Sequence, residues 1–368
     1  MRNIDKFRGC LIGGAAGDAL GYAVEFLDEG QIFEKYGSSG ITEYNLTNGK
    51  ALISDDTQMT LFTANALLFA TTRGMTRGIK GSYESYIQTM YKCWYRTQME
   101  SFPLPDEYLY SWLLNIPELF SRRAPGTTCL TAIELGANGT VSTPINSSKG
   151  CGGVMRVAPI GLYFCDTKTP YEKSDMIGAE AAAITHGHDL GYIPAAVLVH
   201  IIRAVCERDV TIRDAVNEST AAMDKLFPNA EHISYFTTLM NRAVRLAGED
   251  LDDLDAIHQL GQGWVAEETL AIAVYCAIKY ETDFDKALIA AVNHEGDSDS
   301  TGEVTGNILG AKLGYDAIPQ KYKNDLELHD VIIEISDDLC KDCQISEYSP
   351  VKDEVWVSKY IRADYKQS

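Results

Sequence analysis

Two short segments place carboxylates where a helix is expected to begin. The first, Ser54–Thr57, reads Ser-Asp-Asp-Thr and precedes apolar residues at helical spacing. The second, Gly296–Gly302, reads Gly-Asp-Ser-Asp-Ser-Thr-Gly. Ser, Asp and Thr are preferred N-cap residues, and acids near a helix N-terminus are stabilised by the helix dipole. Capping therefore explains either segment alone, although one cap needs only one such residue.

Taken together, the two segments predict a site for hard divalent cations. Asp55 and Asp56 in the first segment and Asp297 and Asp299 in the second supply carboxylate oxygens, and neither segment contains Cys or His. Such donors suit Mg²⁺, Mn²⁺ or Ca²⁺ rather than Zn²⁺. Four carboxylates gathered without cations would repel one another and raise some of their pKa values. Two divalent ions would relieve that repulsion and position a water molecule or substrate oxygens.

Three further segments are candidates for the same site. Glu25, which follows Gly17–Gly21, is either a site acid or a surface Glu at a helix end. The segment Lys149–Arg156 carries glycines before an apolar pattern, so it is either a phosphate-binding backbone segment or a plain loop. Thr185–Asp189 contains two histidines with no Ser or Cys nucleophile signature beside them. A helix-terminal turn is its first interpretation, and ligand contact is the second.

The elements expected to position these residues are helices. Apolar residues fall at helical spacing over residues 58–70, 108–120, 193–205, 235–246, 265–278 and 284–292. The glycines at 9, 13, 17 and 21 have no strand before them, which excludes a dinucleotide-binding fingerprint and predicts close approach of another helix. Val355–Val357 is predicted as a short strand. We expect an all-α fold in which residues 1–345 form one compact domain, followed by a polar tail over residues 346–368.

The composition limits the partners and the compartment. The chain has 32 Lys and Arg against 52 Asp and Glu, a net charge of −20, which argues against nucleic acid because phosphates need a basic footprint. No run of about 18 uninterrupted apolar residues predicts a membrane helix, and the charged N-terminus lacks a signal core. Nine scattered cysteines are typical of reduced thiols, and the Cys340/Cys343 pair lacks a second pair for zinc. We therefore expect a cytoplasmic protein.

In this order, the segments resemble the ADP-ribosylglycohydrolases. That family includes dinitrogenase-reductase-activating glycohydrolase, the ADP-ribosylarginine hydrolases and the crystallin J1-like proteins. The resemblance spans roughly residues 4 to 314 and rests on Phe7–Cys10, Gly17–Gly21, Glu25–Phe26, Ser54–Thr57, Lys149–Pro159, Ile184–His186, Gly261–Glu268 and Asp297–Gly310. The Ser/Thr-Asp-Asp-Thr and Gly-Asp-x-Asp-Ser/Thr motifs are specific in this order, whereas any one piece alone is not.

The resemblance implies an all-helical fold with a cleft for two Mg²⁺ ions, for which Mn²⁺ is a possible substitute. By motif position, the metal ligands would be Ser54, Asp55 and Asp56 for one ion and Asp297, Asp299 and Ser300 for the other. Glu25 matches the acid on the mobile loop over the substrate. The diphosphate would be held by Gly152, Gly153, Val154, Met155 and Arg156, with His186 as a further substrate contact.

The implied reaction is hydrolysis, in which water replaces the group on C1″ of ADP-ribose and releases the unmodified acceptor. The glycine-rich and second acidic segments look closest to arginine-specific members, so the expected substrate is ADP-ribosylated arginine in proteins. Carboxylates would stabilise the developing oxocarbenium charge. A guanidine leaves more easily when protonated. Glu25, Asp55 and Asp56 are the candidate acid–base groups, and the sequence does not rank them.

Several alternatives stay open. The linkage could be to serine, to an acetyl group or to a nucleic acid base, and a non-catalytic member could read ADP-ribose, block a toxin or serve a structural role. Two departures from the family pattern bear on this question. Glu295 stands where relatives often carry glycine, and would be strained if its φ were positive. Glu303 stands where a small or apolar residue is expected. The sequence does not indicate an oligomeric state.

Overall fold

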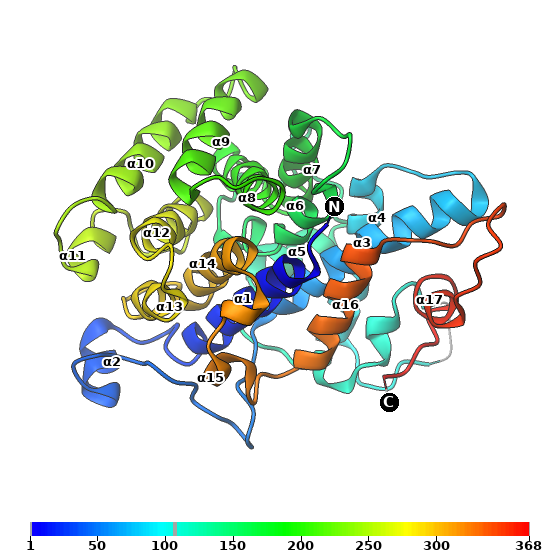
Figure 1. The fold of residues 1–368 in the computed structure, drawn as a ribbon, viewed down its shortest axis with the longest axis horizontal. Helices are drawn as coiled ribbons and strands as arrows, with labels where there is room; N and C mark the ends of the chain where they lie inside the picture. The colour runs from blue at the N-terminus through cyan, green and yellow to red at the C-terminus, as the bar shows by residue number, and fades with distance from the viewer. Residues whose placement is uncertain (1, 106–108, 368) are drawn as a thin grey trace.

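Helices account for the regular structure of the described chain. The computed structural model describes residues 2–105 and 109–367, and within these ranges it forms one compact domain with seventeen α-helices and no β-sheet (Figure 1). The all-α prediction is confirmed. The helices are α1 (Ile4–Gly21), α2 (Glu29–Tyr36), α3 (Asp55–Arg77), α4 (Tyr83–Met99), α5 (Thr127–Glu134), α6 (Ala158–Phe164), α7 (Tyr171–Ala183), α8 (Asp189–Glu207), α9 (Ile212–Leu226), α10 (Ile233–Leu246), α11 (Asp253–Ile257), α12 (Ala266–Lys279), α13 (Phe284–Val292), α14 (Ser298–Leu313), α15 (Gln320–Lys323), α16 (His329–Lys341) and α17 (Glu354–Val357).

Two predictions of local structure were wrong. Residue 108 lies outside the described ranges, and the rest of the 108–120 pattern forms two 3₁₀ helices, η1 (Trp112–Asn115) and η2 (Pro117–Leu119). Pro117 interrupts this run because it has no N–H to donate and disfavours helix at the residue before it. Residues 355–357 are helical rather than a strand, since Asp353 caps α17 by accepting from the Trp356 N–H at 2.9 Å.

Helices α1 and α14 lie side by side in the middle of the fold and run in opposite directions (Figure 1). Glycines at 9, 13 and 17 of α1 face glycines at 310, 306 and 302 of α14, so that a Cβ on any of them would collide with the facing carbonyl group. The predicted close approach of a second helix is confirmed. This contact sets the end of α1, at Gly21, against the start of α14, at Ser298.

Helix α8 belongs to the protein interior. In the described ranges it is the one helix whose length and composition would allow a membrane span, but 89% of the relevant window is buried inside the fold. It packs against α6, α7, α9 and α12. Burial among other helices therefore explains its apolar character.

The segment predicted as a polar tail packs against the helical body as far as residue 367. Trp356 and Tyr360 are buried, and the Trp356 Nε1–H donates to the Thr72 hydroxyl of α3 at 2.9 Å. Lys359 is also buried, with its ammonium group 2.7 Å from an Asp338 carboxylate oxygen. These contacts attach the C-terminal segment to α3 and α16.

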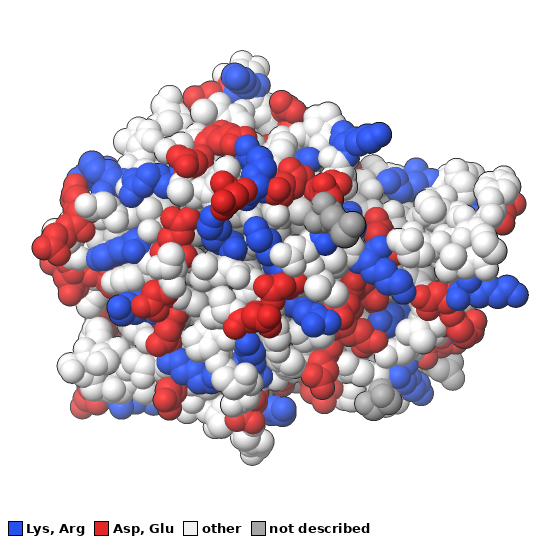
Figure 2. Space-filling view, in the orientation of Figure 1, with Lys and Arg blue, Asp and Glu red and all other residues white. Residues whose placement is uncertain are grey.

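Acidic and basic side chains are interspersed on the face of the molecule seen in Figure 2. All nine cysteines are free. Cys340 and Cys343 do not belong to any group of three metal-type side chains in the described part of the chain.

Candidate active site

The start of α3 presents the first acidic segment in a buried position next to α1. Ser54 caps the helix by accepting from the Asp56 N–H at 3.2 Å, and Asp55 and Asp56 are almost fully buried. Asp18 of α1 accepts hydrogen bonds from the Ser54 N–H at 2.9 Å, the Thr57 N–H at 3.2 Å and the Thr57 hydroxyl at 2.5 Å. Asp18 thereby fixes this helix start against α1.

The start of α14 brings the second acidic segment to the first. Asp297 caps α14, and the Ser300 hydroxyl donates to Oδ2 of Asp56 at 2.6 Å. Burial raises the pKa of Asp299 and the side chains of Asp297 and Ser54 lower it, and the charge of Asp299 raises the pKa of Asp55 after burial. The structure therefore gathers all six residues predicted as metal ligands: Ser54, Asp55, Asp56, Asp297, Asp299 and Ser300.

Glu25 lies on the turn between α1 and α2 and reaches the same cluster. Its side chain is hydrogen-bonded to Asp299, and the residue is only 7% exposed. Its second carboxyl oxygen, Oε2, is buried without a hydrogen-bond partner. An unpartnered buried oxygen carries a desolvation cost, so this position is suited to a ligand or to a proton.

No basic side chain compensates this acidic cluster. Within the described ranges, none of its seven carboxyl groups forms an ion pair with Lys, Arg or His; they belong to Asp18, Glu25, Asp55, Asp56, Asp297, Asp299 and Glu303. Burial and then the charge of Asp299 raise the pKa of Glu25 to about 11 and that of Asp18 to about 7. The same two causes raise the pKa values of Asp55, Asp56 and Asp297 well above the usual range.

The donor set fits hard divalent cations. Carboxylate and hydroxyl oxygens are the ligands that Mg²⁺ prefers, and uncompensated buried carboxylates are stabilised by such an ion. No three of these carboxyl groups have donor atoms that all lie within 4.8 Å of one another in the described chain. In the described chain, the trio whose donor atoms all lie within 4.8 Å of one another is His188, Asp189 and His232, which has a different chemistry.

The predicted diphosphate segment lies against His186. A Cβ at Gly152 would lie 3.0 Å from the His186 ring, and the Thr185 hydroxyl is 2.8 Å from Nδ1 of that ring. Burial, and then the charge of Arg156, lowers the pKa of His186 to about 3, so the ring is neutral. Cys151, just before Gly152, lies near the acidic cluster: burial and then the charge of Asp297 raise the pKa of its thiol.

Other side chains of that segment belong to the core. Arg156 is fully buried, with its guanidinium group 4.3 Å above the Tyr91 ring and donating to the Thr185 hydroxyl at 2.6 Å. Val154 and Met155 are buried as well. A bound diphosphate would therefore meet the backbone near Gly152 and Gly153 rather than these three side chains.

The two departures from the family pattern have different outcomes. Glu295 does not adopt a positive φ, and its carboxylate accepts from the Gln262 side chain at 2.7 Å, so the strain considered above does not arise. Gly296 is the residue in the left-handed region, at φ +129°, where a Cβ would collide with the Gln262 carbonyl. Glu303 is fully buried and accepts from the Thr60 hydroxyl at 2.8 Å.

Sequence reasoning missed three contributors to the cluster. Asp18 is part of the Gly17–Gly21 motif, but nothing local to it reveals its partners 36 to 39 residues away. Cys151 was noticed only as part of a glycine segment. Glu303 was noticed as unusual, and its spacing of one helical turn from Asp299 was the available signal that it would face the same region.

An exposed aromatic pair borders the cluster. Phe26, next to Glu25, is 72% exposed and stacks on Trp264, which is 41% exposed, with ring centroids 6.3 Å apart and planes 22° from parallel. Trp264 is adjacent to Gly263, whose Cβ position lies 3.4 Å from Asp297. Two exposed aromatic rings beside buried acids form a surface suited to a flat or apolar group.

Comparison with known proteins shows the family to which this chain belongs. The family model described as ADP-ribosylglycohydrolase matches residues 1–348. The chain belongs to the ADP-ribosylglycohydrolase family. It is therefore an enzyme of the class that removes ADP-ribose from modified acceptors.

Three relatives illustrate the breadth of the similarity. An uncharacterised protein of Archaeoglobus fulgidus is 29% identical over 340 residues, which cover 90% of this chain and 95% of that protein. ADP-ribosylhydrolase ARH3 of Homo sapiens is 24% identical over 49% of this chain and 54% of that protein. The ADP-ribosyl-[dinitrogen reductase] glycohydrolase of Rhodospirillum rubrum is 25% identical over 88% of this chain and 91% of that protein.

A solved structure has the same fold. A chain of an ADP-ribosylglycohydrolase-related protein complex superposes with a TM-score of 0.60 at 22% identity, covering 92% of this chain and 98% of that one. The similarity supports the helical architecture over nearly the whole chain.

Proposed function

We propose that this ADP-ribosylglycohydrolase is magnesium-dependent and removes ADP-ribose from arginine side chains of proteins. The observation that carries the proposal is the hydrogen bond from Ser300 to Asp56, which joins two acidic helix starts 244 residues apart in the chain. Glu25, on the turn after α1, completes the arrangement from a third element. A group of carboxylate and hydroxyl oxygens of this kind is suited to binding cations and an oxygen-rich substrate.

The chain's oxygen donors would hold two Mg²⁺ ions. Ser54, Asp55 and Asp56 would serve one ion, and Asp297, Asp299 and Ser300 would serve the other. When bound, the ions would supply positive charge that polarises ribose hydroxyls and acidifies a water molecule. The raised pKa values of the buried aspartates support this assignment, because burial and then the charge of Asp299 disfavour their ionised forms, and a bound cation would offset both effects.

Glu25 is the proton-transfer group favoured by the geometry. Hydrolysis breaks the C1″–N bond, whose electron pair leaves with the guanidine, and forms a C1″–O bond to water. The water gives up one proton and the leaving nitrogen gains one, so a single carboxyl group can pass the proton on. Glu25 is favoured over Asp55 and Asp56 because its Oε2 has no protein partner and burial beside Asp299 favours its protonated form.

The remaining contacts would orient the substrate. The backbone near Gly152 and Gly153 would meet the diphosphate, and the neutral ring of His186 lies directly behind that segment. Phe26 and Trp264 border the acids from the solvent side. Holding ribose and diphosphate at fixed positions would keep C1″ close to the acidic cluster, which lowers the entropic part of the barrier.

Two points support arginine in a protein as the acceptor. The relative from Rhodospirillum rubrum is named for acting on a modified protein, dinitrogen reductase. The Lys149–Arg156 and Asp297–Ser300 segments have the versions that look closest to arginine-specific members of the family. Because the chain is also similar to ADP-ribosylhydrolase ARH3, the experiment must include other linkages as competing outcomes.

The deciding experiment measures free ADP-ribose released from proteins modified at arginine or at serine, with Mg²⁺ or with EDTA. We expect release from arginine, its loss in EDTA and its recovery when Mg²⁺ is restored. Asp299→Asn should abolish release, whereas Asp250→Asn, an exposed acid outside the cluster, should not. Release from serine alone would overturn the arginine assignment, and ADP-ribose binding without release from either linkage would overturn the enzymatic proposal.

A further inference from the structure

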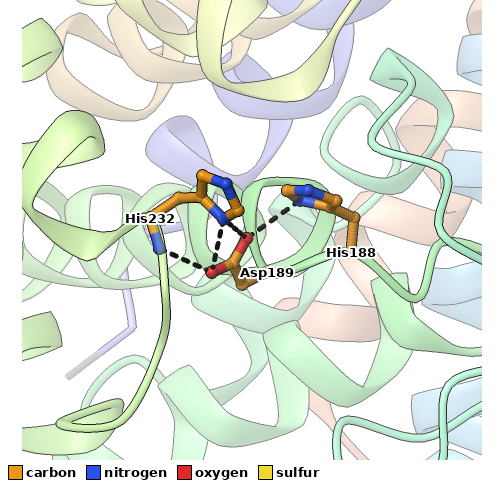
Figure 3. A group of neighbouring side chains, drawn as sticks. All are labelled: His188, Asp189 and His232. Atoms are coloured by element: carbon orange, nitrogen blue, oxygen red, sulfur yellow. Dashed lines mark hydrogen bonds and ion pairs between the residues drawn. The ribbon is translucent and has the colours of Figure 1, made fainter.

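Three side chains with nitrogen and oxygen donors converge where the starts of α8 and α10 meet. His188 is the N-cap of α8 and Asp189 is its first residue, while His232 directly precedes α10. One donor atom of each lies within 4.8 Å of the others. Figure 3 shows the two imidazole rings on either side of the Asp189 carboxylate, with both rings turned toward it.

The distances are close to those of a metal-binding trio. Nδ1 of His188 and Nδ1 of His232 are each 2.9 Å from Oδ1 of Asp189, and the ring centroids are 4.7 Å apart. Donors around a tetrahedral Zn²⁺ at about 2.0–2.1 Å stand roughly 3.3 Å from one another. A widening of a few tenths of an ångström would therefore admit an ion.

The hydrogen bonds at this position leave acceptors facing each other. Nδ1 of His188 accepts from the Leu190 N–H at 3.0 Å and lies 2.9 Å from Oδ1 of Asp189, so two acceptor atoms stand side by side there. That carboxylate accepts from the same Leu190 N–H at 2.8 Å and from the backbone N–H of His232 at 2.8 Å. Nδ1 of the His232 ring is hydrogen-bonded to the carboxylate at 2.9 Å, and this nitrogen would give up its proton to bind an ion. The Leu190 N–H thus lies between two electron-rich atoms, and a cation would bind both lone pairs more strongly than this shared donor does.

Exposure and donor type distinguish this trio from the acidic cluster. The side chains of His188, Asp189 and His232 are 24%, 10% and 37% exposed, which gives an ion and its water ligands access from solvent. Two imidazoles and one carboxylate suit borderline ions such as Zn²⁺, Co²⁺ or Ni²⁺. The all-oxygen cluster at α3 and α14 suits Mg²⁺ instead.

We propose that His188, Asp189 and His232 form a binding site for one transition-metal ion of the zinc type, separate from the acidic cluster. The ion would join the start of α10 to the start of α8. It would also brace the loop before the glycine segment, since the His188 N–H donates to the Ser148 carbonyl at 3.2 Å. His186, which backs onto that segment, is two residues away along the chain.

The test is metal binding by the full chain, independent of catalysis. Zn²⁺ affinity is measured by equilibrium dialysis with Mg²⁺ in excess, and Co²⁺ is added in parallel to record its visible absorption, which is strong for nitrogen-ligated tetrahedral ions and weak for oxygen-ligated octahedral ones. We expect one high-affinity ion per chain. His232→Gln and His188→Gln should each weaken it at least about 100-fold, since loss of even an outer-shell partner costs 10–100-fold.

The matched control is His329→Gln. His329 also has its Nδ1 2.9 Å from a carboxylate, that of Asp330, but no second imidazole joins them. Its substitution should leave the Zn²⁺ affinity and the Co²⁺ spectrum unchanged. Unaltered Zn²⁺ affinity in both His188→Gln and His232→Gln, with folding verified by circular dichroism, would overturn the proposal, as would the absence of a tight ion from the wild-type chain.

Discussion

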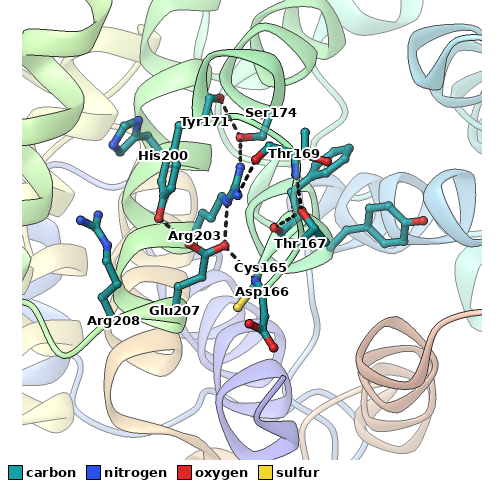
Figure 4. A network of polar contacts seen from close by, with 12 residues as sticks. Cys165, Asp166, Thr167, Thr169, Tyr171, Ser174, His200, Arg203, Glu207 and Arg208 are labelled. Carbon is teal, nitrogen blue, oxygen red and sulfur yellow. Dashed lines mark hydrogen bonds and ion pairs between the residues drawn. The ribbon is translucent and has the colours of Figure 1, made fainter. Parts of the chain in front are cut away.

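Two buried polar regions of this enzyme differ in whether their charged side chains have partners of opposite charge. At the start of α7 and the end of α8, buried charged side chains have partners, as Figure 4 shows around Arg203. That guanidinium pairs with Glu207 at 2.9 Å, donates to the Thr169 carbonyl at 2.7 Å and lies 4.1 Å over the Tyr171 ring. At the starts of α3 and α14, by contrast, seven carboxyl groups gather among described residues without one basic partner.

The difference separates structural from functional charge. A buried ion pair with satisfied hydrogen bonds needs nothing from outside the protein, and removing one partner harms stability. A buried cluster of one sign keeps an electrostatic cost that only a bound cation or bound protons can offset. The paired region therefore belongs to the scaffold, and the unpaired region is the proposed site for ions and substrate.

The largest expected effect separates activity from stability at the acidic cluster. Asp299→Asn should reduce kcat by about 10³-fold, equivalent to about 4 kcal/mol of transition-state stabilisation, because it would remove a proposed metal ligand. The free energy of unfolding of the metal-free protein should not fall, since one repulsive charge is removed. Steady-state release assays and urea denaturation in EDTA measure the two quantities. A variant that unfolds while Asp250→Asn stays folded would contradict this assignment.

The converse result is expected in the paired region. Arg203→Met should lower the free energy of unfolding by about 4 kcal/mol, because it leaves the Glu207 carboxylate without its buried partner. Activity per folded molecule should stay at the wild-type level. Urea denaturation with active-site titration distinguishes the two effects. A loss of kcat in fully folded Arg203→Met would show that this network also serves catalysis.

The next largest expected effect is the pH dependence of the free energy of unfolding of the metal-free protein. The pKa of Glu25 is raised to about 11 in the folded state, so its stabilising contribution is complete below its unfolded pKa and is lost as pH rises toward 11. In EDTA, Glu25 alone should make the free energy of unfolding fall by about 1.4 kcal/mol per pH unit, or roughly 3 kcal/mol from pH 5 to pH 7, and the aspartates with raised pKa values should add to this slope. Glu25→Gln should reduce the slope by its own share in urea denaturation series, and saturating Mg²⁺ should remove it. A wild-type slope of the opposite sign would refute the interpretation.

The smallest effect concerns the helix contact that brings the acids together. Gly306→Ala should lower the free energy of unfolding by about 2 kcal/mol, because the added methyl group would press on the Gly13 backbone. Gly248→Ala is the matched control, since its nearest neighbour stands 3.5 Å from the added carbon. Thermal melting of both variants measures the difference. Equal melting temperatures would mean that α1 and α14 can separate without penalty.

Much of the fold could be predicted because its signals are local. The apolar spacing over residues 284–292 coincides with α13, and the glycine stripe of α1 correctly indicated a close helix contact. Residues 355–357 were misread because three large apolar side chains suit either a strand or a helix, and the capping Asp353 decides for the helix. Pro117 likewise decides for 3₁₀ turns where the apolar pattern alone indicated one helix.

Only the parts of the candidate site that lie in short sequence motifs could be predicted. The acids of Ser54–Thr57 and Asp297–Ser300 were recognisable because each segment carries more acids than capping requires. The role of Asp18 was not, since its hydrogen bonds depend on how α1 meets α3 in space. The burial of Arg156 was equally invisible: its guanidinium is enclosed by Tyr91 and Thr185 from distant parts of the chain.

The glycine contact between α1 and α14 has a consequence for how this enzyme can change over time. Main chain rests directly on main chain there, so the spacing of the two acidic helix starts does not depend on the size of any interior side chain. Outer helices and loops can drift or be exchanged while the distance between the two acidic helix starts is inherited unchanged. Grafting new recognition surfaces onto this pair of helices is therefore a practical route to enzymes with other specificities.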